Sequence, residues 1–169
     1  MIGWYCWQTF GTTWQSHQKH EQVVAELETG WGEGSVTVDT EFGPASAIIR
    51  IPRFGADYAV PMLEGTSDEV LAAGFGHIEG TDGPGEPGNF VVAGHRITHG
   101  EPLRDMPDLE VGDEILVETA DRVSTYVLTT GGDDLEVPFT ASWVLDTIPV
   151  NPDPDGVVAT GGPSLMTLT

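Results

Sequence analysis

The sequence predicts a mainly β domain, and two observations carry this prediction. The chain of 169 residues contains 22 glycines and 12 prolines, which divide most of it into short segments. The apolar residues between these breaks lie in short runs rich in valine and isoleucine, residue types that favour strands over helices. A chain of this length can fold around one core of ordinary size, so we expect one domain with an N-terminal extension.

The first 29 residues predict a helical segment in front of the domain. Residues 12–28 are good helix formers, and Val23, Val24 and Leu27 form a narrow apolar stripe. Residues 1–14 contain tryptophan and tyrosine at a density that suits a membrane interface or an amphipathic helix docked on the domain. Both alternatives stay open, as does a sequence that begins inside a longer membrane helix.

The remaining chain is divided by composition. Residues 30–44 are interpreted as an acidic linker because they show no sustained apolar period, and residues 45–169 as the β domain. Thr66 followed by Glu69 is a capping-box pattern that opens a short helix, and residues 76–88 are expected to be a loop. The expected elements are strands over residues 47–54, 58–63, 89–93, 114–119, 122–129, 142–149 and 164–169, and a helix over residues 67–73.

The composition excludes several function classes. A total of 27 acidic and 6 basic side chains gives a net charge of −21, which would repel a phosphate backbone, so no nucleic acid partner is expected. Cys6 is the single cysteine, so neither an internal disulfide nor a cysteine-based zinc site can form. The sequence contains no phosphate-binding loop with a lysine and no G-x-S-x-G elbow, and no cofactor is predicted.

The stretch G-N-F-V-V-A-G-H-R-I-T-H-G, residues 88–100, is the strongest candidate for a functional site. Residues 89–93 predict a buried strand that ends just before His95, an imidazole able to titrate near neutral pH. From the pattern alone, His95 is either a histidine that merely ends a strand or a residue that takes part in a reaction. In an extended chain the side chains of His95 and His99 would lie roughly 13 Å apart, so a shared metal would need the loop to curl back.

Four sequence blocks resemble the sortase family. They are G-E-P-G-N-F-V-V-A-G-H-R-I-T-H-G at residues 85–100, L-E-V-G-D-E-I-L-V-E-T-A-D-R-V at 109–123, W-V-L-D-T-I-P at 143–149 and L-M-T-L-T at 165–169. The N-F-x-x-A-G-H-R block, with T-H-G after it, is most similar to the class E branch, with class D next. The resemblance covers the chain from about Ala45 to its end.

This resemblance implies an eight-stranded β-barrel with short helices, facing outward from the cell membrane and tethered by an N-terminal membrane segment. It implies cysteine transpeptidation, in which a thiolate attacks the Thr–Gly bond of a Leu-(Pro/Ala)-x-Thr-Gly-like signal. The implied partners are the sorting-signal peptides of secreted proteins and an amine of a peptidoglycan precursor, which releases the acyl-enzyme. The family's catalytic histidine falls on His95, and His99 and His77 are candidates for the substrate groove.

Two residues of the family's catalytic set have no counterpart in this sequence. The nucleophilic cysteine closes a T-L-x-T-C motif and would fall two positions past Thr169, and the catalytic arginine lies on the next strand. Cys6 belongs to the N-terminal segment and is no substitute, and Arg96 does not occupy the arginine position. We therefore expect a barrel without its C-terminal strand or strands, and a polypeptide that is inactive on its own.

Two other hypotheses stay open at this point. The chain is alternatively a non-catalytic surface module, in which a β-barrel keeps a peptide-binding groove without a thiol. A third hypothesis is an acidic metal-binding β domain that draws on His77, His95 and His99, although the expectation is that no residue of the site binds a metal.

Overall fold

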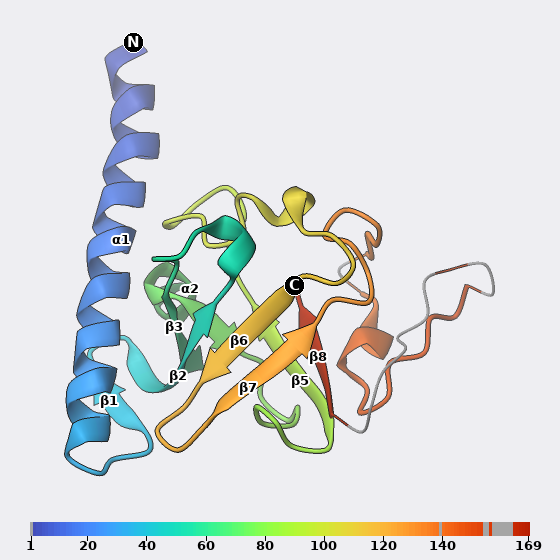
Figure 1. Cartoon of the computed structure of the whole chain (residues 1–169). Coiled ribbons are helices and arrows are strands. Elements are labelled where there is room, and N and C mark those ends of the chain that lie inside the picture. Colours follow the sequence, from blue (N-terminus) through green and yellow to red (C-terminus); the bar gives the residue numbers. More distant parts are fainter. Residues whose placement is uncertain (1, 139, 154–155, 157–163) are drawn as a thin grey trace.

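Eight strands form one sheet that curls into a nearly closed barrel, and a long helix stands beside it (Figure 1). The computed structural model describes residues 2–138, 140–153, 156 and 164–169. The strands are β1 (Val38–Thr40), β2 (Gly43–Arg50), β3 (Val60–Glu64), β4 (Phe75–His77), β5 (Gly88–Ala93), β6 (Glu114–Glu118), β7 (Val123–Val127) and β8 (Ser164–Leu168). The helices are α1 (Ile2–Gly32) and α2 (Asp68–Ala73), with 3-10 turns η1 (Pro52–Phe54), η2 (Met106–Asp108) and η3 (Ser142–Leu145). The predicted mainly β class is confirmed.

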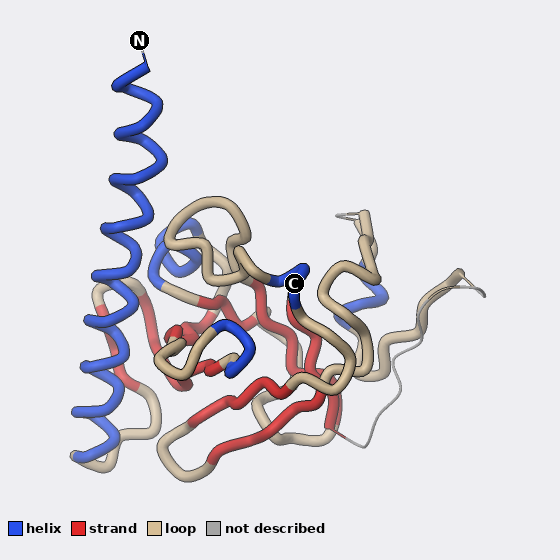
Figure 2. The backbone as a smooth tube through the Cα atoms, turned by 45° about the horizontal axis from the view of Figure 1, so that its top comes forward, coloured by secondary structure: helices blue, strands red, loops and turns tan. Residues whose placement is uncertain are grey.

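The order of hydrogen-bonded strands around the sheet is β7-β6-β2-β3-β4-β5-β8, and β1 pairs with β2 beside this path. The pairs β3–β4 and β5–β8 are parallel. The other pairs are antiparallel. Figure 2 shows how the strands tilt around a common centre, as the twist of a curled sheet requires. β7 and β8 are the two ends of the path, and each keeps one edge without a partner strand among the described residues.

Two apolar clusters stabilise this arrangement. The first fills the barrel and includes Phe75, Phe90 and Ile49. The second lies outside the barrel, where Ile48 packs with Val23 and Leu27 of α1. β2 serves both clusters because successive side chains of a strand point to opposite faces. Burying the Val23 and Leu27 side chains contributes about 1.5–3 kcal/mol each, so this part of α1 is docked on the fold.

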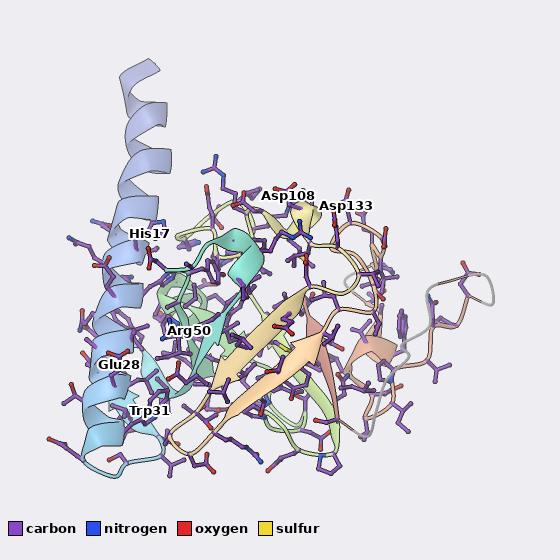
Figure 3. The ribbon with its side chains drawn as sticks, in the orientation of Figure 1. His17, Glu28, Trp31, Arg50, Asp108 and Asp133 are labelled. Carbon is purple, nitrogen blue, oxygen red and sulfur yellow. The ribbon has the colours of Figure 1, made fainter. Side chains whose placement is uncertain are left out.

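α1 is one continuous helix over 31 residues, longer than the predicted segment. Its N-terminal part extends past the barrel (Figure 1), whereas the part from His17 to Trp31 runs beside the sheet (Figure 3). The predicted helical character of the N-terminal segment is confirmed. Within the described residues, no helix combines the length and the apolarity needed to cross a membrane.

Some local predictions were wrong, and short elements account for most of them. Residues 30–44, interpreted as an acidic linker, contain the end of α1, the whole of β1 and the start of β2, with Val38 paired to Ala45. The predicted loop over residues 76–88 begins inside β4. Strands of three residues, such as β1 and β4, are too short to show a period in the sequence, and pairing with other strands forms them.

The ends of two other predicted elements also differ. The strand predicted over residues 47–54 stops earlier, because Pro52 opens the 3-10 turn η1. Residues 142–149, predicted as a strand, begin with the 3-10 turn η3 instead. The helix α2 is capped by Ser67 rather than Thr66, since the Val70 backbone N–H donates a hydrogen bond of 3.3 Å to the Ser67 Oγ.

Candidate functional site

β5 and β8 run parallel, so their C-terminal ends meet at the same edge of the sheet. Val92 pairs with Leu168. Beyond this pair, the Thr169 N–H donates to the Val92 carbonyl at 2.9 Å, and the Gly94 N–H donates to the Thr169 carbonyl at 2.8 Å. His95 follows directly, so the buried strand β5 delivers this histidine to the sheet edge, as the sequence predicts.

Gly94 is needed at the point where β5 ends. A Cβ at this position would lie 2.7 Å from the Phe75 Cε1 and 3.3 Å from the Leu103 Cδ1, which is too close for a side chain. The loop then returns to its start, because the Leu103 N–H donates a hydrogen bond of 3.1 Å to the His95 carbonyl. The backbone of His95 is therefore held from both sides.

Residues 95–100, which we name the histidine loop, curl back on themselves. The ring centroids of His95 and His99 lie 4.7 Å apart and the ring planes are inclined by 30°. His99, Gly100 and Glu101 have φ angles of 52°, 82° and 50°, so three consecutive residues adopt the left-handed conformation. The two predicted site histidines are thus neighbours, while Arg96 is exposed.

The imidazole of His95 is electrostatically suited to exchange a proton. Burial lowers the pKa of His95 below 6.5, the charge of His99 lowers it further, and the carboxylate of Asp68 opposes both effects. Among the described residues, no group forms a hydrogen bond with the ring of His95. A half-buried imidazole that is mostly neutral at physiological pH can accept a proton and return it.

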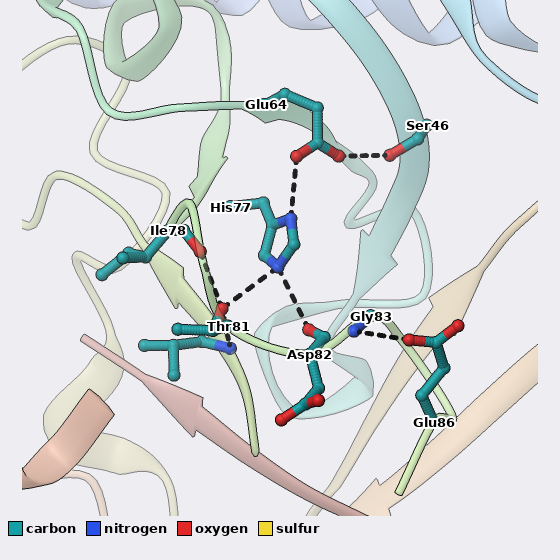
Figure 4. A network of polar contacts seen from close by, with 9 residues as sticks. Ser46, Glu64, His77, Ile78, Thr81, Asp82, Gly83 and Glu86 are labelled. Atoms are coloured by element: carbon teal, nitrogen blue, oxygen red, sulfur yellow. Dashed lines mark hydrogen bonds and ion pairs between the residues drawn. The ribbon is translucent and has the colours of Figure 1, made fainter. Parts of the chain in front are cut away.

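His77 lies in a different environment, which we name the His77 network (Figure 4). Its Nδ1 lies 2.8 Å from the Glu64 Oε2, and its Nε2 lies 3.1 Å from both the Asp82 carbonyl oxygen and the Thr81 Oγ1. The hydrogen bond with Glu64 is the main reason why the pKa of His77 is raised above 6.5. Both ring nitrogens are occupied within the fold, and the assignment of His77 to a substrate groove stays a prediction.

Asn89 is a buried residue that the sequence analysis did not single out. Its side-chain Nδ2 donates to the carbonyls of Val144 and Asp146 at 2.9 and 3.0 Å, and the Thr167 hydroxyl donates to its Oδ1 at 2.9 Å. It therefore connects β5, β8 and the C-terminal end of η3 with the residue that follows it. A single asparagine at the start of a buried apolar run was the available signal, because a fully buried amide needs partners.

A cavity of about 450 Å³ opens between β7 and β8, the two ends of the sheet path. Its lining is mainly apolar and includes Ile115, Tyr126, Leu128, Trp143, Leu165 and Met166. None of the residues that line it is a histidine, so the cavity is separate from the histidine loop. In the part of the chain that the structure describes, no three histidine, cysteine, aspartate or glutamate side chains gather as metal ligands would.

Known proteins share long stretches of this sequence. The sortase domain family model matches residues 49–169, which include the barrel from the last two residues of β2 onward. The chain is 35% identical to sortase SrtE1 of Streptomyces coelicolor over 134 residues, covering 75% of this chain and 38% of that protein. It is 34% identical to sortase D of Bacillus subtilis over 87 residues, covering 52% of this chain and 41% of that protein. The chain thus spans about two fifths of these relatives' length.

Solved structures share the fold as well. Sortase E from Streptomyces avermitilis superposes with a TM-score of 0.60 at 41% identity, covering 65% of this chain and 70% of that one. Sortase E1 from Streptomyces coelicolor, solved with a tripeptide in its active site, gives a TM-score of 0.59 at 36% identity, covering 72% and 74%. The resemblance seen in the four sequence blocks is confirmed over most of the barrel. By its family match, its identities and its fold, this chain belongs to the sortase family.

Proposed function

We propose that this chain provides the barrel and the catalytic histidine of a sortase-type transpeptidase. The reaction cleaves the Thr–Gly bond of a Leu-(Pro/Ala)-x-Thr-Gly-like sorting signal and joins the threonine carbonyl to an amine of a peptidoglycan precursor. The family match over residues 49–169 supports the reaction class. The tripeptide in the active site of the Streptomyces coelicolor enzyme supports a peptide as substrate.

The register of β5 against β8 is the observation that carries this proposal. Val92 pairs with Leu168, so the parallel register, continued along both chains, sets the second position past Thr169 opposite His95. The T-L-x-T-C motif of the family has its cysteine at that second position. Because neighbouring strands lie about 4.8 Å apart, a thiol there would be within reach of the His95 imidazole.

His95 has the properties that the two half-reactions need. In the first, a thiolate adds to the threonine carbonyl carbon, the C–N bond breaks, and protonated His95 gives its proton to the leaving glycine nitrogen. In the second, the neutral imidazole takes a proton from the incoming amine as the thioester breaks. A pKa lowered only by partial burial and by His99 lets the ring alternate between these forms near neutral pH.

The proposal extends to partners and location. The substrates are sorting-signal peptides of secreted proteins, and the acceptor is a peptidoglycan-precursor amine at the outer face of the cell membrane. The tryptophans and tyrosine of residues 1–14 support a link between the N-terminal segment and the membrane. His99 is the better supported groove residue because its ring contacts His95, whereas both nitrogens of His77 are bonded within the fold.

The coding DNA beyond the Thr169 codon provides the first test. We expect a Thr-Cys pair followed by a strand with an arginine. A polypeptide extended through that strand should cleave a fluorogenic Leu-x-x-Thr-Gly peptide, and His95→Ala should lower its kcat/KM by about 10²–10⁴-fold. His17→Ala, which removes an exposed histidine from α1, is the matched control and should retain activity.

The 169-residue chain itself gives the complementary test. It should show no acyl transfer above the background of its His95→Ala variant, because its single cysteine, Cys6, belongs to the N-terminal segment and not to a T-L-x-T-C motif. Turnover above that background would contradict our assignment of the nucleophile. A stop codon directly after Thr169 would instead favour the non-catalytic peptide-binding module.

A further inference from the structure

The helix α1 contacts the histidine loop, although the two are far apart in the sequence. A Cβ added at Gly100 would lie 2.8 Å from the Ser16 Cβ and 2.9 Å from the His20 Cε1. Ser16 and His20 are only 3% and 4% exposed, so this contact excludes solvent. The loop that begins with His95 is therefore packed directly against the N-terminal helix.

The loop reaches this contact in a conformation that ordinary residues avoid. His99 and Glu101 have φ angles of 52° and 50°, and left-handed backbone at a non-glycine residue costs on the order of 1 kcal/mol. Gly100, with φ of 82°, satisfies both the backbone angle and the close approach of α1. The conformation persists because the packing on α1 and the hydrogen bond of 3.0 Å from the Glu101 N–H to the Thr98 carbonyl hold it.

This backbone conformation decides where the ring of His99 lies. The ring stacks beside His95 at 4.7 Å, yet its Nδ1 is buried without a hydrogen-bond partner among the described residues. The Nε2 of His20 is buried in the same way. Because no such bond fixes either nitrogen, the position of both rings depends on packing between α1 and the loop.

We infer that α1 helps to form the site, because Ser16 and His20 pack against Gly100 and hold the histidine loop in place. The loop in turn holds the His99 ring against the His95 imidazole. His99 and His20 are then positioning residues for the catalytic histidine. The role given to His95 rests on the proposed function, whereas the contact between helix and loop does not. Moving α1 away from the barrel would therefore change the proton affinity of His95, although His95 itself is not altered.

A histidine titration by NMR tests this inference on the 169-residue chain. Gly100→Ala adds a methyl group against Ser16 and His20 and should separate the loop from α1. We expect the pKa of His95 to rise toward 6.5, since the burial and the nearby His99 that lower it are both reduced. The ring protons of His95 should also lose the ring-current shift that His99 causes.

Gly80→Ala is the matched control for this experiment. Gly80 has a φ of 84°, close to that of Gly100, but nothing lies within 4 Å of its added Cβ. It introduces the same backbone cost without the contact and should leave the titration of His95 unchanged. Equal shifts in the two variants, or an unchanged His95 in Gly100→Ala, would overturn the inference.

His99→Asn provides a second test if Gly100→Ala fails to fold. Asparagine tolerates left-handed backbone better than most residues, so the variant removes the ring and adds no bulk. The ring-current shift on His95 should disappear and its pKa should rise, while the urea midpoint changes little. Resonances of His95 that match the wild type would contradict a positioning role for His99.

The titration needs no substrate, so it separates the inference from the proposed function. If the extended polypeptide does not cleave the sorting peptide but Gly100→Ala still shifts the pKa of His95, the proposed function fails and the coupling to α1 stands. If cleavage depends on His95 and neither Gly100→Ala nor His99→Asn alters the titration of His95, the proposed function stands and the coupling between α1 and His95 is wrong.

Discussion

The His77 network and the histidine loop use the same residue type in opposite ways. In the network, a carboxylate, a hydroxyl and a backbone carbonyl surround both ring nitrogens, and the pKa of His77 is raised. In the loop and at its contact with α1, the buried nitrogens of His99 and His20 have no partner among the described residues. The pKa of His95 is lowered there. Neighbouring groups thus make His77 a structural connection within the fold and leave His95 free to exchange its proton.

His20 is the most buried histidine, and its titration should have the largest effect on the free energy of unfolding. Its pKa is lowered to about 4, by burial first and by the charges of His17 and Lys19 next. The unfolded chain binds this proton near 6.5, so the stabilisation is complete above pH 6.5 and is lost as the pH falls toward 4. The free energy of unfolding should fall by about 2 kcal/mol by about pH 5 from this group alone.

His20→Gln isolates this contribution, because glutamine does not titrate. Urea unfolding of the variant should show a shallower loss of stability between neutral pH and about pH 5 than the wild type does. The acidic groups common to both chains cancel in the difference. Identical slopes would show that His20 is not buried in its neutral form.

The His77 network predicts the next largest effect. His77→Ala removes the partner of Glu64 and Thr81 and the ring contact with Phe90, whose centroid lies 5.3 Å away. The free energy of unfolding should fall by about 1.5 kcal/mol at neutral pH in a urea titration. A loss no larger than that of His95→Ala would remove the distinction between the two regions.

Glu64→Gln separates the charge in the network from its hydrogen bonds. The pKa of Glu64 is lowered and that of His77 raised, so the pair is stabilised above about pH 4.5 and below about pH 6.5, and weakens beyond either side. The variant should bring the pKa of His77 back toward 6.5 at a cost of less than about 1 kcal/mol, since Glu64 is 41% exposed. NMR titration should show His95 unchanged, and a parallel shift of His95 would link the two regions.

His95→Ala should have the smallest effect on stability. No described group forms a hydrogen bond with its ring, so the free energy of unfolding should change by less than about 0.5 kcal/mol at neutral pH. In the wild type, NMR titration should give His95 the lower pKa and His77 the higher one. The reverse order would contradict the assignment of the two environments.

Some elements were predictable because their signals are local. β5, β8 and the hairpin of β6 and β7 are apolar runs bounded by turn residues, and the structure has all four. The segment over residues 142–149 misled the prediction, since an apolar run of that length is compatible with a strand or a turn, and η3 forms there instead. β1 forms a tight hairpin with β2, and β4 pairs with β3 and β5, but three residues are too few to leave a periodic trace of either strand in the sequence.

The sequence by itself determined the mainly β class, the strand that ends just before His95, and the resemblance to the sortases, because these depend on local composition, turn chemistry and motif order. The tertiary structure alone decided that both nitrogens of His77 are bonded, that His99 folds back on His95, and that His20 lies beneath Gly100. These contacts join segments that are distant along the chain or depend on backbone angles, and the packing of the whole fold determines both.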